Sequence, residues 1–426
     1  MHILLLGQGA REHAMAQSIS KSKLCKKLFV APGNAITTSI YHKIEAIDSP
    51  NNFTQIKNAI IDNSIDLVIS GLEEPLVNGL YDELYNHPEL KGVKIIGPCK
   101  KGALLEGSKV FSKDFMEKYN IPTAKYKSFT NQDTDSALKY IETINFPIVI
   151  KADGLASGKG VLICQNYQEA KEAVNDILNK NIFGASGSKI VIEEFLNGIE
   201  ASIFLATDGQ NYVLLPSAKD YKKIGLNDTG PNTGGMGAIS TPPFIDDSLL
   251  EKIRTKIISP TINGLKKEGI DYKGFIFVGI MNVNNEPYVL EYNVRLGDPE
   301  TECILPKIES DFLELLIKIS DEKLDSYTIK ISDLYSATIV LASDGYPGKY
   351  ENGKIISNIN QIQNSIINYA GISQSGEDII TNGGRVLTIT SLARTLEEAI
   401  KISLTNANLI HFSNKYFRKD IGFDVL

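Results

Sequence analysis

The sequence predicts a protein of mixed α/β and α+β class, with an open parallel-sheet domain, a strand-rich core and a small α/β domain. At the amino-terminal end, short apolar runs that end near glycine alternate with helix-like stretches, which is typical of a β-α-β sheet. Strand-like runs dominate the middle of the chain, and strands with one amphipathic helix follow. We therefore predict three domains, over residues 1–102, 103–327 and 328–426.

The composition indicates a globular protein without a nucleic-acid or membrane partner. The chain has 426 residues, 42% of them hydrophobic, and a net charge of −7, so it has no basic footprint for a nucleic acid. Its 4 cysteines show no paired spacing, which is typical of a reducing compartment. The start has too short an apolar run for a signal peptide, and no stretch approaches the ~20 apolar residues of a membrane span. We expect a cytoplasmic protein.

The amino-terminal domain is predicted from four apolar runs, at residues 2–7, 26–33, 66–71 and 93–97. Ligands of such sheets bind outside the carboxyl ends of the strands. We therefore expect ligand contacts in the glycine-containing turns at residues 7–13, 31–34 and 70–75.

The first of these turns, GQGAREHA, only partly matches a dinucleotide-binding fingerprint. Gly7 and Gly9 fit the pattern G-x-G-x-x-G/A, but Glu12 stands in its last place, where it would crowd a pyrophosphate. We interpret the segment as a tight strand–helix turn, with Arg11 and Glu12 facing a smaller ligand. An NAD-dependent oxidoreductase is the alternative, and Glu12 argues against it.

A small α/β unit over about residues 122–190 contains the glycine-rich stretch KADGLASGKGV, residues 151–161. The stretch is not a P-loop, because three residues separate Gly154 from Gly158 and no Ser or Thr follows Lys159. We predict a hairpin tip between two strands, where glycine N–H groups can approach phosphate oxygens. A tight turn without a ligand is the alternative.

Three lysines could neutralise a phosphate chain beside this hairpin. Lys151 ends an apolar strand, Lys159 lies in the glycine-rich stretch, and Lys109 opens a helix predicted to run through about residue 119. A lysine at a strand end is more often solvated, so the prediction depends on the combination with a metal site.

The stretch YVLEYNVRLGDPETE, residues 288–302, predicts a strand with that metal site. Alternate residues of a strand share a face, so we expect Glu291, Asn293 and Arg295 to point the same way. A carboxylate beside an amide oxygen suits Mg²⁺ that bridges nucleotide phosphates, and the arginine can clamp a phosphate or a carboxylate. A solvent-facing polar strand is the alternative.

Two further segments are predicted to contact ligands. Glu193, Glu194 and Glu200 lie where the run IVIEEFLNGIEAS turns acidic, and a carboxylate there suits ribose hydroxyls, although acids at a strand end are common without a ligand. Residues 219–238 form a long polar loop rich in glycine, and loops of this length in a compact domain usually have a function.

Two capping patterns predict helix starts elsewhere. Asn166 and Thr395 are each followed three residues later by Glu, at Glu169 and Glu398.

Together these motifs resemble the ATP-grasp superfamily, and within it the phosphoribosylamine–glycine ligases. The motifs are KADGLASGKGV, IEEFL, DTGPNTGGMGA and EYNVRLGDPET, with GQGAREHA and APGNA before them and TNGGRVL and YFRKDIG after them. They span the whole chain in the family's order, and GPNTGGMGA followed by RLGDPET is highly specific to it. The resemblance implies an ATP-grasp core with a mobile lid subdomain over about residues 122–190.

The resemblance also implies roles for individual residues. ATP would be bound by Lys109, Lys151, Gly158, Lys159, Glu200 and the segment Glu193, Glu194, Phe195 and Leu196. Glu291 and Asn293 would bind Mg²⁺ or Mn²⁺, and Arg295 and Lys151 would be catalytic. Glycine and 5-phosphoribosylamine would contact Gly9, Arg11, Glu12, Glu73, Asp220, Lys222, Arg295, Gly297 and Asp298.

The implied reaction is an ADP-forming carbon–nitrogen ligation in de novo purine (IMP) biosynthesis, with ATP as co-substrate and glycyl phosphate as intermediate. We expect a monomer or a weak homodimer that acts on small molecules. Ala10, Leu72, Tyr221 and Lys223 depart from the family pattern and leave the substrate contacts open. Another ATP-grasp carboxylate–amine ligase and a non-catalytic nucleotide-binding module are the alternatives.

Overall fold

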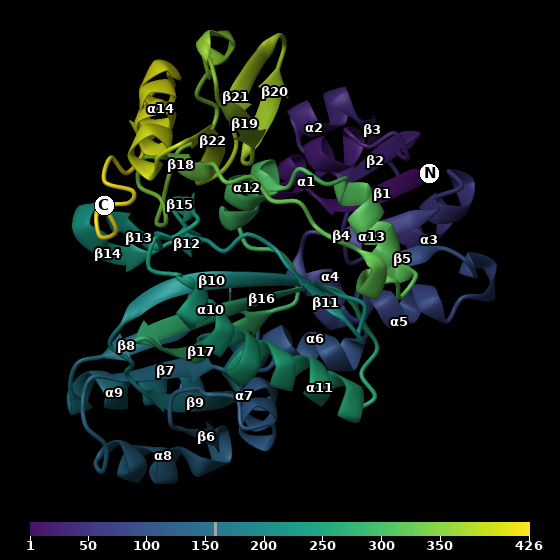
Figure 1. Ribbon diagram of the computed structural model, residues 1–426. Coiled ribbons are helices and arrows are strands. Elements are labelled where there is room, and N and C mark those ends of the chain that lie inside the picture. The colour runs from purple at the N-terminus through teal and green to yellow at the C-terminus, as the bar shows by residue number, and fades with distance from the viewer. Residues whose placement is uncertain (157–159) are drawn as a thin grey trace.

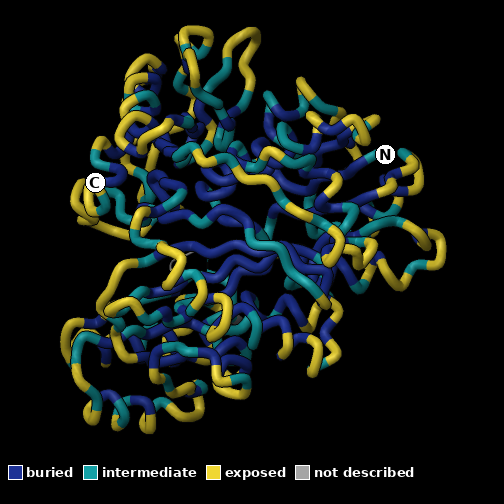
Figure 2. Tube along the Cα trace, in the orientation of Figure 1, coloured by how far each residue is buried: buried dark blue, intermediate teal, exposed yellow. Residues whose placement is uncertain are grey.

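The computed structural model describes residues 1–156 and 160–426, apart from the side chain of Ala185. The amino-terminal and carboxy-terminal units lie beside each other, and the core extends below them to a separate four-stranded unit (Figure 1). The strands through the middle of the molecule are its most continuously buried segments (Figure 2). Among the described residues, every helix is too short or too polar to span a bilayer.

The amino-terminal residues form the predicted parallel sheet, in the order β3-β2-β1-β4-β5. Its strands are β1 His2–Gly7, β2 Lys27–Pro32, β3 His42–Lys43, β4 Leu67–Ser70 and β5 Lys94–Pro98. The surrounding helices are α1 Ala10–Ser20, α2 Ala35–Ile40, α3 Phe53–Asp62, α4 Glu73–Asn78, α5 Leu80–Tyr85 and α6 Lys100–Gly107. Alternate residues of β1 belong to two different cores, one with α3 and α5 and the other with α1, so both faces of the sheet are covered.

The parallel sheet continues into the core through one antiparallel pairing. Strand β16, Tyr272–Val283, pairs with β5 by placing Tyr272 opposite Pro98 and Lys273 opposite Gly97. It also pairs with β10, Ile199–Thr207, and with β17, Glu286–Asn293, while β11, Tyr212–Leu214, extends the edge. The result is one nine-stranded sheet that joins the amino-terminal domain to the core, which the sequence pattern did not predict.

Helices cover this shared sheet on both sides. Residues of α10 Asp247–Ile253 and α11 Ser259–Lys267 pack in one core with the sheet, and residues of α13 Phe312–Ser320 pack in the other. The short helix α12, Glu300–Ile304, lies between the core and the carboxy-terminal unit and contacts α1, β15 and β18.

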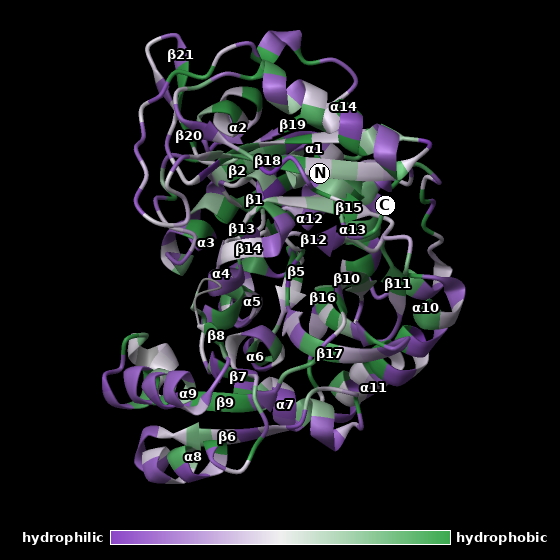
Figure 3. Ribbon diagram, turned by 90° about the vertical axis from the view of Figure 1, so that its left-hand side faces the viewer, coloured by the Kyte–Doolittle hydropathy of each residue, from purple (hydrophilic) through white to green (hydrophobic). Residues whose placement is uncertain are grey.

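The predicted small α/β unit is a four-stranded antiparallel sheet in the order β6-β9-β7-β8. Its elements are β6 Tyr126–Thr130, β7 Ile148–Ala152, β8 Val161–Cys164, β9 Lys189–Glu194, α8 Thr134–Ile141 and α9 Tyr167–Val174, and α7 Lys109–Lys118 precedes it. Helices α8 and α9 show mixed polar and apolar residues (Figure 3), and their apolar residues form a core of their own with the sheet. The predicted hairpin between β7 and β8 is confirmed by the pairing of Lys151 with Val161.

The carboxy-terminal unit is a six-stranded sheet, β12-β15-β18-β22-β19 with β23 beside β18, packed against α14 Leu396–Leu409. Its strands are β12 Lys219–Asp220, β15 Gly237–Ser240, β18 Tyr335–Ser343, β19 Ile366–Tyr369, β22 Arg385–Ala393 and β23 Lys415–Tyr416. Two hairpins complete it, β13 Lys223–Gly225 with β14 Thr229–Asn232 and β20 Ile372–Ser375 with β21 Asp378–Thr381. The two ends of the predicted loop 219–238 are thus strands of this sheet.

Both predicted helix caps are present. The Asn166 side chain accepts a hydrogen bond from the backbone N–H of Glu169 at 3.0 Å, and the Thr395 hydroxyl accepts one from Glu398 at 3.2 Å.

The junction between β5 and β16 provides a test of the shared sheet. A Cβ atom at Gly274 would lie 3.2 Å from the Cα of Gly97, so a side chain there would press against the backbone of β5. We expect Gly274→Val to lower the free energy of unfolding by about 1–3 kcal/mol, measured by urea denaturation. Gly274→Ala should cost less, and equal midpoints for the valine variant and the parent would contradict this account of the junction.

Candidate active site

Glu291 lies at the centre of the candidate site, because the charges that act on it come from four separate segments. Burial alone would raise the pKa of Glu291, but the positive charges of Lys109, Lys222, Lys151 and Arg295 lower it from its ordinary value. Lys109 begins α7, Lys151 lies in β7, Lys222 follows β12 and Arg295 follows β17. The structure thus brings Lys109, Lys151 and Lys222 together with the residues of the predicted strand.

Glu291 and Asn293 have the properties of a divalent-metal site. They are alternate residues of β17 and share a face of that strand. The largest causes of the pKa shift of Glu291 are burial and four positive charges, and Asn293 is 8% exposed, with an amide oxygen that could act as a metal ligand. An ionised carboxylate beside a polar amide is a donor set that fits Mg²⁺ or Mn²⁺.

Arg295 does not continue that strand face, because β17 ends at Asn293. Its guanidinium donates from Nε to Glu73 at 3.2 Å and from Nη2 to Glu106 at 2.8 Å. The other oxygen of Glu106 accepts the backbone N–H of Val294 at 2.7 Å. The predicted strand therefore ends before Arg295, whose guanidinium is held between two carboxylates and whose charge still acts on Glu291.

These two carboxylates are in different electrostatic surroundings. Burial would raise the pKa of Glu73, but Arg295 and Arg11 lower it to about 2. Burial raises the pKa of Glu106 although Arg295 opposes the shift. Glu106 was missed from the sequence, since a single acid next to the end of α6 lies in no recognisable motif.

Glu193 holds two lysines rather than one. Its Oε1 lies 2.9 Å from the Lys151 ammonium and its Oε2 lies 2.9 Å from that of Lys113. Lys151 also donates to the backbone carbonyl of Leu290 at 2.9 Å, which fixes the end of β7 against β17. Lys109 donates to the carbonyl of Glu106 at 3.4 Å. Lys113 was not predicted from the sequence.

The segment Glu193, Glu194, Phe195 and Leu196, which the resemblance assigns to ATP, spans the end of β9. The backbone N–H of Glu194 donates to the carbonyl of Lys125 at 3.0 Å, and the Glu194 carboxylate accepts the N–H of Lys125 at 2.9 Å. Phe195 is 37% exposed, and neither Phe195 nor Leu196 makes a backbone hydrogen bond to another described residue. Their peptide groups are therefore available to a ligand.

Asp220, Lys222 and Glu200 form a polar cluster next to the metal residues. Lys222 lies 2.7 Å from Glu200 and 3.9 Å from Asp220. Burial raises the pKa of Asp220, and burial together with the charge of Asp220 raises that of Glu300 to about 7. The hydroxyl of Ser202 donates to Glu300 at 3.0 Å.

The amino-terminal turn is closed on itself in this conformation. Glu12 accepts the backbone N–H of Gly9 at 2.6 Å and pairs with the Nε of Arg11 at 2.7 Å. Arg11 also donates to the carbonyl of Leu296 at 3.1 Å, which ties the turn to the segment after β17. A Cβ atom at Gly7 would overlap the Glu12 side chain. Glu12 is 1% exposed, and its buried carboxylate stabilises the turn through the hydrogen bond from Gly9.

One arginine of the carboxy-terminal unit links two glycine-rich segments. Arg385 donates from Nη1 to the carbonyl of Gly234 at 2.7 Å and to that of Asp298 at 2.9 Å, and it pairs with the Asp298 carboxylate at 2.8 Å. The predicted residue Gly297 precedes Asp298 and packs against Glu300. Arg385 was missed, although it follows two glycines in TNGGRVL. Glycines allow two backbone segments to come close together, and the next side chain then lies beside both.

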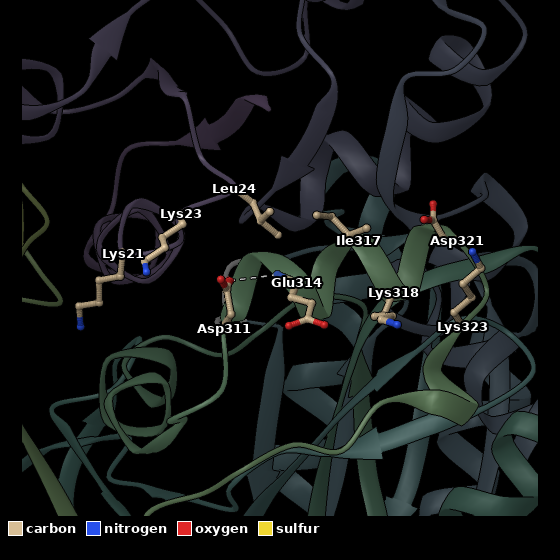
Figure 4. Close-up of a pocket in the computed structure, with 9 residues that line it drawn as sticks. All are labelled: Lys21, Lys23, Leu24, Asp311, Glu314, Ile317, Lys318, Asp321 and Lys323. Carbon is tan, nitrogen blue, oxygen red and sulfur yellow. Dashed lines mark hydrogen bonds between the residues drawn. The ribbon is translucent and has the colours of Figure 1, made fainter.

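The predicted residues Gly158 and Lys159 lie outside the described residues. A surface depression of ≈ 710 Å³ lies elsewhere, between the end of α1 and helix α13 (Figure 4). Its lining includes Lys21, Lys23, Asp311 and Lys318, and none of the candidate site residues.

Comparisons with known proteins assign the chain to a family. Its segments match three domain models of phosphoribosylglycinamide synthetase, the N domain over residues 1–106, the ATP-grasp (A) domain over 107–301 and the C domain over 336–424. The phosphoribosylamine–glycine ligase of Fusobacterium nucleatum is 43% identical over 427 residues, covering 99% of this chain and 98% of the relative. That of Haemophilus influenzae is 44% identical, with the same coverage.

Solved structures agree with this result. The crystal structure of phosphoribosylamine–glycine ligase from Thermotoga maritima has a TM-score of 0.84 and 33% identity, covering 99% of this chain and 100% of that one. The biotin carboxylase domain of Hydrogenobacter thermophilus 2-oxoglutarate carboxylase, at 17% identity and a TM-score of 0.76, shares the fold. Both the resemblance and the predicted fold class are confirmed, and the chain belongs to the phosphoribosylglycinamide synthetase family.

Proposed function

We propose that the protein ligates glycine to 5-phosphoribosylamine with ATP, giving glycinamide ribonucleotide, ADP and phosphate in de novo purine biosynthesis. The observation that carries the proposal is the placement of Lys151, 2.9 Å from the carbonyl of Leu290, and of Lys222, 2.7 Å from Glu200, close enough to Glu291 for their charges and that of Lys109 to lower its pKa. Catalysis of phosphoryl transfer depends mainly on positioned cations and metal ligands, which this arrangement supplies. The full-length relatives support the choice of substrates.

The nucleotide is proposed to lie between β17 and the four-stranded unit of β6, β9, β7 and β8, which we call the lid unit. Lys109 and Lys151 would neutralise the phosphates, with Gly158 and Lys159 of the predicted hairpin tip beside them. The free peptide groups of Phe195 and Leu196 support an adenine contact, since a purine edge needs one donor and one acceptor.

Glu291 and Asn293 would hold Mg²⁺ or Mn²⁺. The metal, when bound, would neutralise charge on the ATP phosphates. The lowered pKa of Glu291 keeps its carboxylate ionised, as a metal ligand must be.

The two remaining substrates are proposed to lie where the three units of the chain meet. Glycine would face Arg295 and the cluster of Asp220, Lys222 and Glu200. The phosphoribosyl part would lie towards Gly9 and the turn of Gly297 and Asp298, which Arg385 ties to the carboxy-terminal unit.

The chemistry would proceed in two transfers. The glycine carboxylate attacks the γ-phosphorus of ATP, the bond to the bridging oxygen breaks, and ADP leaves with glycyl phosphate formed. The amine of 5-phosphoribosylamine then attacks the acyl carbon, phosphate leaves with the bonding electrons, and the amine nitrogen loses a proton. Water would hydrolyse the acyl phosphate, so the site must exclude water between the steps. We also propose that the protein is cytoplasmic and is a monomer or a weak homodimer.

The first test is ADP release with Mg·ATP, glycine and freshly made 5-phosphoribosylamine, with each omitted in turn. We expect ADP only when all three are present. ADP that requires a different amine would keep the ligase chemistry but overturn the acceptor, and an absence of ATP turnover would contradict the proposal as a whole.

Replacing Glu291 by Ala should lower ADP release at least about 10²-fold, because the metal-binding carboxylate is lost. Glu286→Ala is a matched control, since Glu286 lies on the same strand but pairs with the surface lysines Lys252 and Lys256. The control should keep its activity. Activity retained by the Glu291 variant, with an unchanged circular dichroism spectrum, would exclude the metal assignment.

Replacing Arg295 by Lys should lower kcat about tenfold or more, because a single ammonium cannot replace the fork that bridges Glu73 and Glu106. Steady-state kinetics with glycine as the varied substrate measure the effect. The exposed Arg254→Lys serves as a control, and kinetics identical to the parent for both variants would rule out a role for Arg295.

A further inference from the structure

The buried ion group formed by Lys113, Glu193 and Lys151 has a member that the proposed mechanism does not use. Lys113 comes from α7, Glu193 from β9 and Lys151 from β7. Lys113 is 2% exposed, Glu193 2% and Lys151 5%, so all three charges are withdrawn from water. Burying a charge is costly unless it is paired, so a second lysine at this position requires an explanation.

The geometry shows that the carboxylate is divided between the two ammonium groups. One Glu193 oxygen lies 2.9 Å from Lys113 and the other lies 2.9 Å from Lys151. The Lys151 contact does not have the geometry of a hydrogen bond, because Glu193 Oε1 has no hydrogen-bond partner among the described residues. One negative charge therefore serves two positive charges, and the group carries a net positive charge.

We infer that Lys113 is a positioning residue that keeps the charge of Lys151 available to an anion. Without Lys113, Glu193 would neutralise Lys151 alone, and the pair would attract a phosphate only weakly. With Lys113 present, the shared carboxylate leaves an excess positive charge at the end of β7. The anion that this charge suits is the phosphate chain of a nucleoside di- or triphosphate, so the inference rests on the proposed function.

Lys113 also anchors the group to the core. Its ammonium donates to the Thr123 hydroxyl at 2.7 Å, and that hydroxyl donates to the carbonyl of Val289 at 2.6 Å. Lys151 donates to the next carbonyl, that of Leu290, at 2.9 Å. Helix α7, through Thr123, and strand β7 are thereby held against β17 at Val289 and Leu290, two residues or fewer from Glu291.

The pKa of Lys113 agrees with this arrangement. Burial lowers the pKa of Lys113 to about 8, although the charge of Glu193 opposes the shift. The charged groups that face it are Glu193 and Glu194 on β9 and Lys151 on β7, and the ring of Tyr126 on β6 lies 5.6 Å away. The charge of Lys113 is present below pH about 8 and is lost as the pH rises through that value.

The test is ADP binding by titration calorimetry with the full chain and no other substrate. Lys113→Met should weaken ADP binding about tenfold or more, whereas Lys113→Arg keeps the charge and should stay within about threefold of the parent. The KM for glycine should not change. Lys118→Met is a matched control from the same helix, because the Lys118 side chain is 62% exposed and pairs with Glu268 outside the site.

A second variant separates charge from anchoring. Thr123→Val removes the hydroxyl but leaves Lys113 charged, so it should keep ADP affinity even if it lowers the melting temperature. If Lys113→Met binds ADP like the parent and loses only thermal stability, Lys113 is a structural residue and the inference is wrong.

The pH dependence gives a readout that does not require the methionine variant to fold. ADP affinity of the parent should fall as the pH is raised through about 8, and that of Lys113→Arg should not. Equal profiles for the two proteins would overturn the inference. A parent that binds no ADP at any pH would instead contradict the proposed function.

Discussion

The pairing of β16 with β5 is the interaction on which the rest of the structure depends. It places an antiparallel strand directly beside a parallel sheet, so the edge of one domain becomes the interior of a larger sheet. Because β16 also pairs with β17, Glu291 and Asn293 are fixed relative to the amino-terminal turns. A loose linker between the domains would not hold side chains at the distances that chemistry requires.

Within this frame, the site is organised by charge. Positive groups from α7, β7 and the segment after β12 surround one ionised carboxylate, and their mutual repulsion is offset by Glu193, Glu200 and Glu106. These charged groups are already in place before a substrate binds, so they need little reorganisation during phosphoryl transfer. Glu193 is shared between Lys113 and Lys151, which leaves positive charge for an anionic ligand.

The sequence predicted local features well and long-range contacts poorly. The parallel strands, the β7–β8 hairpin and the Asn166 and Thr395 caps follow from periodicity and spacing, because each depends on neighbouring residues. The placement of Glu291 and Asn293 on one strand face could be predicted for the same reason, since alternation along a strand is local. The end of β17 before Arg295 could not, because strand pairing with β16 sets that boundary.

The residues that the sequence missed share a physical cause. Glu106, Lys113 and Arg385 each act on a partner that is distant along the chain, and each sits in a segment whose pattern indicates an ordinary helix or strand. Their function is visible only once burial is known, since a buried charge must have a partner. Glu12 differs from these residues, because the sequence motif drew attention to it, but its carboxylate is buried and bonded to Gly9 of the same turn.

Arg385 shows why the three units of the chain must act together. Its guanidinium joins the backbone of Gly234, in the glycine-rich loop, to both the carbonyl and the carboxylate of Asp298, in the turn after β17. The same turn lies beside Gly9, where a Cβ atom would approach the Asp298 carboxylate to 3.7 Å. A ligand at this point would therefore contact all three units, and displacement of the carboxy-terminal unit would release both glycine-rich segments at once. The carboxy-terminal unit, although distant from β17 in sequence, is thus tied through Arg385 to the turn that follows that strand.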